Sequence, residues 1–117
     1  QIRPNIHIDD ITDVYIHLID HPDVCGIYNA GFENISILDI AKLVAKHIPV
    51  EIEVTESNDP RSYRVNSDKL LATGFKPKKT VEHAVQEIIE KYRSGVVKDE
   101  ERYYNLKWMQ NTVLAGR

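Results

Sequence analysis

Two groups of side chains have spacings that could support chemistry. Asp13, His17 and His21 recur every four residues, so on a helix they would lie on one face, as metal ligands do. His21 precedes Pro22, and a proline disfavours helical geometry in the residue before it. The helix should end there, before a three-ligand site is complete, and we expect no metal site.

The second group is Tyr103 and Lys107, which form a Tyr-x-x-x-Lys pattern. A tyrosine transfers protons at neutral pH only where a fixed positive charge and a bound reactant lower its pKa. This pair stands in a highly charged tail, far from the rest of any recognisable site. We interpret the spacing as coincidence and expect no catalytic residue in this chain.

The alternation of polar and apolar residues predicts three strands. The first covers residues 5–8, the second covers residues 26–30 between two glycines, and the third covers residues 50–54. The third has the strictest alternation, with valine or isoleucine at every second position. Residues 63–65 are expected to form a further short extended piece.

Helical spacing of apolar residues predicts four helices between these strands. Each is preceded by a residue whose side-chain oxygen can accept a hydrogen bond from a free backbone N–H of the first turn. At the second helix, an acidic residue three positions on completes a capping-box pattern. The expected caps are Asp9 or Asp10, Ser36 with Asp39, Ser67 and Thr80, and the expected ends are before Pro22, at Gly74 and at Gly95.

Composition narrows the class of protein. The chain has 117 residues, 42% of them hydrophobic and 28% charged, which suits one globular α/β domain without a membrane span. A formal net charge of −3 and scattered basic residues exclude a nucleic-acid backbone as the expected partner. The single Cys25 requires no oxidising compartment, so the expected location is cytoplasmic.

A series of short motifs follows along residues 2–92. The motifs are Arg3-Pro4-x-Ile6-His7-Ile8-x-Asp10, Ile27-Tyr28-Asn29-x-Gly31, Ser36-Ile37-x-Asp39-Ile40, Asp59-x-Arg61-Ser62-Tyr63-x-Val65-x-Ser67-x-Lys69 and Gly74-Phe75-x-Pro77-x-Lys79-Thr80. As a series, in this order, they resemble the extended short-chain dehydrogenase/reductase family, which holds NAD-dependent nucleotide-sugar epimerases and dehydratases.

The resemblance implies the C-terminal, substrate-binding part of an NAD(P)-binding Rossmann-like fold. Residues 1–95 would be the substrate-side α/β portion, and residues 96–117 a charged tail with a short docking helix. In the family, a glycine-rich turn and a catalytic Tyr-x-x-x-Lys pair belong to the N-terminal half. The glycines here stand singly, at positions 26, 31, 74, 95 and 116. We therefore expect the chain to begin mid-protein, to be inactive alone, and to leave NAD or NADP to the rest of its parent.

The resemblance also assigns substrate-binding residues. Arg3 stands where epimerases use an arginine against the nucleotide phosphates, and Arg61 lies in the loop from which relatives send a second. A guanidinium group suits this role because its planar fork meets two phosphate oxygens at once. Tyr63 could stack on or bond the nucleotide, or simply pack. The alternative for Arg61 is a surface arginine paired with Asp59.

These expectations define the partners. The ligand would be a nucleotide-sugar, and the macromolecular partner would be the missing N-terminal Rossmann half or a second copy. Self-association is expected because residues 26–30 would otherwise leave backbone groups and apolar side chains uncovered. The alternative function is a stand-alone, non-enzymatic binding or oligomerisation module.

Overall fold

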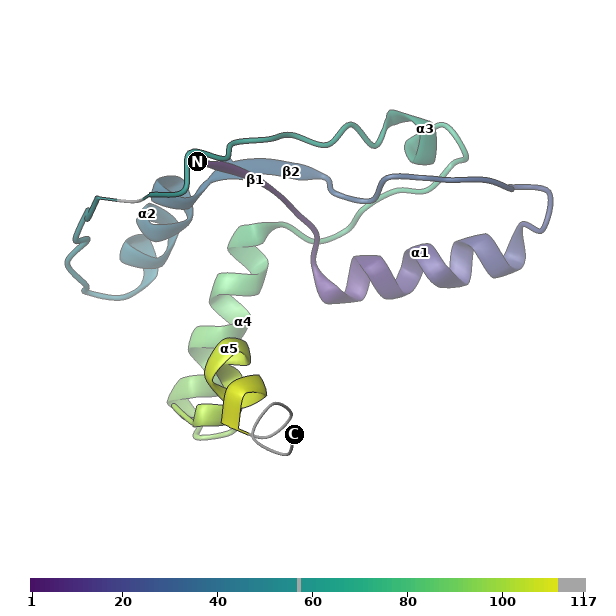
Figure 1. Ribbon diagram of the computed structural model, residues 1–117. Coiled ribbons are helices and arrows are strands. Elements are labelled where there is room, and N and C mark those ends of the chain that lie inside the picture. The colour runs from purple at the N-terminus through teal and green to yellow at the C-terminus, as the bar shows by residue number, and fades with distance from the viewer. Residues whose placement is uncertain (57, 112–117) are drawn as a thin grey trace. The chain divides into compact units, whose positions relative to one another are not determined.

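The computed structural model describes residues 1–56 and 58–111. The chain divides into two compact units, Gln1–Gln86 and Glu87–Arg117, and the division falls inside helix α4 (Val81–Arg93). Among the described residues it is a small mixed α/β protein with five α-helices and a two-stranded sheet (Figure 1). The predicted α/β class is therefore confirmed.

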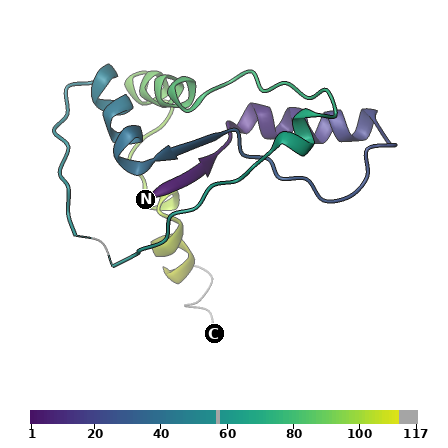
Figure 2. The ribbon, with the colours of Figure 1, turned by 90° about the horizontal axis from the view of Figure 1, so that it is seen from above.

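The sheet of the first unit pairs two strands that are distant in sequence. Strand β1 (Ile2–Asn5) runs antiparallel to β2 (Glu33–Ser36), with Arg3 opposite Ile35. Figure 2 shows the two strands side by side. Because helix α1 lies between them in sequence, this is a long-range pairing and not a hairpin.

The first helix, α1 (Ile8–Asp20), begins earlier than predicted. His7 is its N-cap, and the ring Nδ1 accepts a hydrogen bond from the backbone N–H of Asp9 at 3.1 Å. The predicted cap at Asp9 or Asp10 and the predicted strand over residues 5–8 were both wrong, because a histidine nitrogen supplies the acceptor upstream of the aspartates. The helix ends before Pro22, as predicted.

Asp10 has a different task from the one expected. Its side chain is buried, with 1% exposed, and its two carboxylate oxygens accept hydrogen bonds from the backbone N–H groups of Lys78 and Lys79 at 2.9 and 3.0 Å. A salt bridge of 2.7 Å between Lys78 Nζ and Asp13 lies beside them. Asp10 thus fastens the segment before α4 to the first turn of α1.

Helix α2 (Ile37–His47) directly follows β2, and its cap was predicted correctly. The Ser36 hydroxyl accepts the backbone N–H of Asp39 at 3.0 Å and donates to the Asp39 carboxylate at 2.6 Å. The last turn of α2 meets the start of α4, where Glu82 accepts from Lys46 and His47 at 2.6 and 2.8 Å. These two donors lower the pKa of the Glu82 carboxyl.

The caps and ends of the later helices are mixed in outcome. Thr80 caps α4, because its hydroxyl accepts the backbone N–H of His83 at 3.3 Å. Gly74, with φ of +94°, and Gly95, with φ of +75°, close α3 and α4 in the left-handed region, as predicted. The cap at Ser67 was wrong: its hydroxyl makes no bond to α3 (Asp68–Leu71).

Ser67 instead joins two segments that are far apart in sequence. Its hydroxyl donates to the carbonyl oxygen of Gly31 and accepts from the Gly31 N–H, both at 3.0 Å. A Cβ atom on Gly31 would come within 3.1 Å of the Pro4 Cβ, so the absence of a side chain at position 31 lets this backbone pack closely against Pro4.

Two predicted strands, over residues 26–30 and 50–54, do not form in the structure. Gly26 is in the left-handed region, with φ of +110°, and begins an irregular connection to β2. Residues 50–54 are irregular and exposed. A strand needs a paired edge, and within the described residues neither segment has one, so a strand-like pattern alone does not produce a strand.

The core of the first unit is small. Val14, Leu70 and Phe75 are buried together, and the rings of Phe75 and Phe32 stack at 5.6 Å between centroids. Val85 is buried as well. The partly buried residues that pack against the three-residue cluster are Ile11, Leu18, Tyr28, Ala30 and Phe32.

The second unit continues from α4 through a 3₁₀ turn (Glu101–Tyr103) to a short helix, α5 (Asn105–Met109). The tail thus contains the predicted helix, while its docking role stays a prediction; residues 112–117 lie outside the described residues. The Tyr104 hydroxyl donates to Asp99 at 2.6 Å, which raises the pKa of that hydroxyl. Within the described residues, none of the helices combines the length and apolarity needed to cross a membrane.

Candidate functional site

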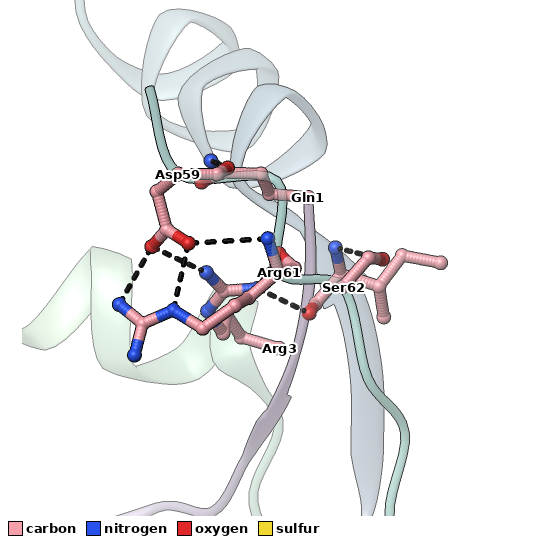
Figure 3. Close-up of polar contacts among 6 residues, drawn as sticks. Gln1, Arg3, Asp59, Arg61 and Ser62 are labelled. Carbon is pink, nitrogen blue, oxygen red and sulfur yellow. Dashed lines mark hydrogen bonds and ion pairs between the residues drawn. The ribbon is translucent and has the colours of Figure 1, made fainter. Parts of the chain in front are cut away.

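The segment carrying Asp59 and Tyr63 runs beside β1. The backbone N–H of Tyr63 donates to the carbonyl of Ile2 at 3.2 Å, and the N–H of Ile2 donates to the Ser62 hydroxyl at 3.0 Å. The side-chain amide of Gln1 also donates to the carbonyl of Asp59. These contacts bring the loop against the first residues of the chain without forming a regular strand (Figure 3).

Further along, a side chain of β2 holds the same segment. The Asn34 Oδ1 atom accepts the backbone N–H of Val65 at 2.8 Å, and the Asn34 Nδ2 atom donates to the Val65 carbonyl at 2.9 Å. This amide therefore satisfies both backbone groups of one residue. We did not identify Asn34 from the sequence, where a single asparagine gives no sign that its side chain will bind a distant backbone segment.

Arg3 is held firmly on β1. Its Nη1 donates to the carbonyls of Ile2 and Arg61 at 2.9 and 2.6 Å, and its Nη2 donates to Asp59 Oδ2 at 3.3 Å. The guanidinium carbon lies 5.0 Å from the centre of the Tyr63 ring, within the range of a cation–π interaction. Only 21% of the Arg3 side chain is exposed. These contacts hold the guanidinium group in one orientation.

Arg61 binds the same carboxylate from the solvent side. Its Nε and Nη2 donate to the two Asp59 oxygens at 2.7 and 2.8 Å, a bidentate ion pair, and its backbone N–H donates to Oδ1 at 3.1 Å. This is the pairing with Asp59 that the sequence left open as the alternative for Arg61. With 76% of its side chain exposed, Arg61 keeps its remaining donors toward solvent.

The charges of this group are strongly coupled. Hydrogen bonds from the Arg61 side chain and backbone, together with the charge of Arg3, hold the pKa of the Asp59 carboxyl below its usual range. The same hydrogen bond to Asp59 raises the pKa of Arg61. We call Arg3, Asp59, Arg61 and Tyr63 the Arg3 cluster. Two guanidinium groups and one carboxylate leave it one net positive charge, suited to an anion that can share or replace Asp59.

The pKa of Asp59 offers a direct check of this geometry. In a carbon-detected NMR titration, the Asp59 carboxyl should titrate below its ordinary value of 3.8. The Arg61→Ala variant should bring it back toward that value, because the largest cause of the shift is removed. Since the folded-state pKa is depressed, the pairing stabilises the fold above about pH 4 and is lost as the pH falls through the lowered value. Arg64→Ala is the matched control, and an equal shift in both variants would contradict the assignment.

A cavity of about 470 Å³ is lined in part by residues 64–68, which follow Tyr63 in the sequence, but no residue of the Arg3 cluster lines it. Its wall includes Arg64, Asn34, Phe32 and Leu71, and none of Arg3, Arg61 and Tyr63 contributes to it. Arg64 is exposed and makes no hydrogen bond or ion pair with any described residue. The structure thus unites the three predicted residues at the surface, outside this hollow.

The residues of the candidate metal group have other partners. His17 Nε2 shares a hydrogen bond of 2.9 Å with the Thr73 hydroxyl, and His21 Nδ1 donates to the carbonyl of His17 at 2.8 Å. Asp13 pairs with Lys78.

No family model matches the chain. The Arg3 cluster and the motif series are therefore the two features from which a function can be argued.

Proposed function

We propose that this chain is the substrate-side portion of an NAD(P)-dependent nucleotide-sugar epimerase or dehydratase of the extended short-chain dehydrogenase/reductase family. In this proposal the Arg3 cluster binds the diphosphate of the nucleotide-sugar. The observation that carries it is the convergence of Arg3 and Arg61, 58 residues apart in sequence, on one carboxylate beside Tyr63.

The geometry suits a diphosphate in two respects. Arg3 is already oriented by two backbone carbonyls, so little side-chain entropy is lost when it binds a ligand. Arg61 presents a mostly exposed fork whose present partner, Asp59, is an oxyanion that a phosphate can imitate. The Tyr63 side chain is 53% exposed, which leaves ring surface for a nucleotide base.

The residues of this chain do not fit a dinucleotide cofactor. Its five glycines stand singly, so the sequence lacks the glycine-rich turn at a helix N-terminus that receives a pyrophosphate. In the proposal, the Rossmann-like half of the parent protein binds NAD or NADP and performs the chemistry. The part described here contributes substrate binding and is inactive alone.

Calorimetry with UDP on the full chain tests the proposal, with NAD as a second ligand. UDP should bind and NAD should not. Arg3→Ala should weaken UDP binding about tenfold or more, since a hydrogen bond to a charged group contributes about 1.5–3 kcal/mol. Asp59→Asn should tighten binding, because it removes a competing carboxylate. Arg64→Ala serves as the matched arginine control and should leave the affinity unchanged.

A purely structural ion pair gives a different pattern. Asp59→Asn should lower the melting temperature in either case, but with a purely structural pair neither the parent chain nor any variant would bind UDP, a result that contradicts phosphate binding at this cluster. The UDP affinity and the melting temperature, measured on the same variants, separate the two roles.

One observation favours the second candidate, a non-enzymatic binding or oligomerisation module. Apolar side chains on α1 and on the connection after it are widely exposed, with Ile8 at 70%, Ile19 at 76% and Ile27 at 88%. Large apolar side chains exposed to this degree are more common on contact faces than on the rest of a protein surface. If the chain binds neither UDP nor NAD but sediments as an oligomer, the result would support this candidate. Self-association itself stays a prediction.

A further inference from the structure

The connection after α2 has a strand pattern, but its backbone is not hydrogen-bonded to any part of the chain that the structure describes. Residues 50–56 make no hydrogen bond, ion pair or ring contact with any described residue. Valine or isoleucine alternates with glutamate over residues 50–54, and Figure 2 shows this connection leaving α2 and returning beside the N-terminus. The backbone donors and acceptors of the segment are therefore available to another chain.

An apolar groove lies along this segment. Its volume is about 410 Å³, and Ile52 and Val54 line one side while Ile37, Leu38 and Ala41 of α2 line the other. Val54 is 80% exposed and Ile37 is 51% exposed, so the groove is open to solvent. A strand laid against residues 50–55 would cover this apolar surface while its backbone pairs with theirs.

We propose that residues 50–55 form a docking edge for an extended peptide strand of a partner protein, whose alternate residues are basic. Glu51 and Glu53 favour lysine or arginine in the partner strand. Both glutamates are exposed, and neither pairs with a cation among the described residues. Opposite charges facing each other across paired strands are stabilising. Apolar residues at the intervening positions of the partner would enter the groove.

The same charges disfavour a second copy of this chain as the occupant. In an antiparallel pair centred on Ile52, Glu51 of one copy would face Glu53 of the other. Like charges directly opposite each other across strands are destabilising. A parallel pair in register would place each glutamate beside its own equivalent, with the same result. A basic strand removes this repulsion, and a second copy does not.

Nitrogen-15 NMR of the full chain with two capped peptides tests the proposal. The basic peptide is Gly-Val-Lys-Val-Lys-Val-Lys-Gly, and the acidic one has glutamate in place of each lysine. The basic peptide should shift the resonances of residues 50–55 and slow amide exchange at every second residue, the pattern of strand pairing along one edge. The acidic peptide should bind about tenfold more weakly or not at all.

Charge reversal should invert this preference. The double variant Glu51→Lys, Glu53→Lys should bind the acidic peptide and lose at least about tenfold in affinity for the basic one. Asp20→Lys with Glu90→Lys changes the net charge equally at exposed positions elsewhere and should behave like the parent chain. Equal binding of both peptides, or equal effects of the two double variants, would overturn the proposal.

Proline substitutions distinguish strand pairing from simple occupancy of the groove. Residues 52 and 55 have opposite parity, so in a strand their N–H groups point to opposite edges. The two proline variants should therefore differ in binding: one of Ile52→Pro and Thr55→Pro should lose the basic peptide and the other should retain it. Both should melt like the parent chain, because neither residue is hydrogen-bonded to any other described residue. Retention in both variants, no binding by the parent chain, or dimers that pair through residues 50–55 would contradict the proposal.

Discussion

Replacing Asp10 by alanine should destabilise the first unit by about 3–5 kcal/mol, because it orphans two backbone donors that the carboxylate now satisfies. Those donors are the N–H groups of Lys78 and Lys79, and Asp10 is 1% exposed. A unit of this size, Gln1–Gln86, has a free energy of unfolding of about 4–13 kcal/mol. The loss is a large share of that total, and urea denaturation followed by circular dichroism measures it.

The neighbouring aspartate provides the control. Asp9 is exposed, and its carboxylate lies 3.6 Å from the Lys79 ammonium and 3.7 Å from the ring of His7. Asp9→Ala should change the free energy of unfolding by less than about 1 kcal/mol. Asp10→Asn should fall between the two alanine variants, since it retains one accepting oxygen. Similar losses for Asp9→Ala and Asp10→Ala would show that the buried carboxylate has no special role.

Leu70→Ala should cost about 2–5 kcal/mol, the range for removing a fully buried leucine and leaving a cavity. Leu70 has no exposed surface and packs with Val14 and Phe75 at the centre of the small core. Since so few side chains of the described chain are buried, the surrounding residues can offer little compensation. The expected measurement is a fall in the denaturation midpoint without a change in its slope.

Leu71→Ala is a closely matched control. The two leucines are adjacent on α3, so both variants alter helix propensity and hydrophobicity in the same way. Leu71 is 38% exposed, and we expect its replacement to cost no more than about 1 kcal/mol. If the two variants lose equal stability, the core is not centred on Leu70.

Features that depend on nearby residues were predictable from the sequence. The hydroxyl of Ser36 and the acid three positions on lie within one helical turn, so their pairing needs no information from the rest of the fold. The same holds for Thr80, for the end of α1 before Pro22, and for the glycines that close α3 and α4. Each of these outcomes is decided by the conformational preference of one or two residues.

Features that depend on residues distant in sequence were not predictable from the sequence. Residues 50–54 have the strictest alternation in the chain but pair with no strand of residues 1–56 and 58–111, whereas β2, which alternates weakly, pairs with β1. Ser67 has the composition of a cap, yet its hydroxyl is taken by Gly31, 36 residues away. In both cases a long-range partner outweighs the local preference, and periodicity carries no information about such partners.

The candidate site divides in the same way. Arg3, Arg61 and Tyr63 were identified by their place in the motif series, and the pairing of Arg61 with Asp59 was the stated alternative. The approach of Arg3 to that same carboxylate was not foreseen, nor was its hold on two backbone carbonyls. Backbone acceptors leave no trace in a sequence, so the orientation of a guanidinium group bound to them cannot be inferred from residue types.

The amide of Asn34 has a consequence for how the Arg3 cluster is assembled. Because one side chain grips both backbone groups of Val65, a slide of the chain by a single residue would break two hydrogen bonds together. Asn34 thus fixes the register of the loop, that is, which loop residue lies beside each residue of β1. Six residues before Val65, that register delivers Asp59 to Arg3, so an uncharged side chain on the opposite strand determines where the charges meet.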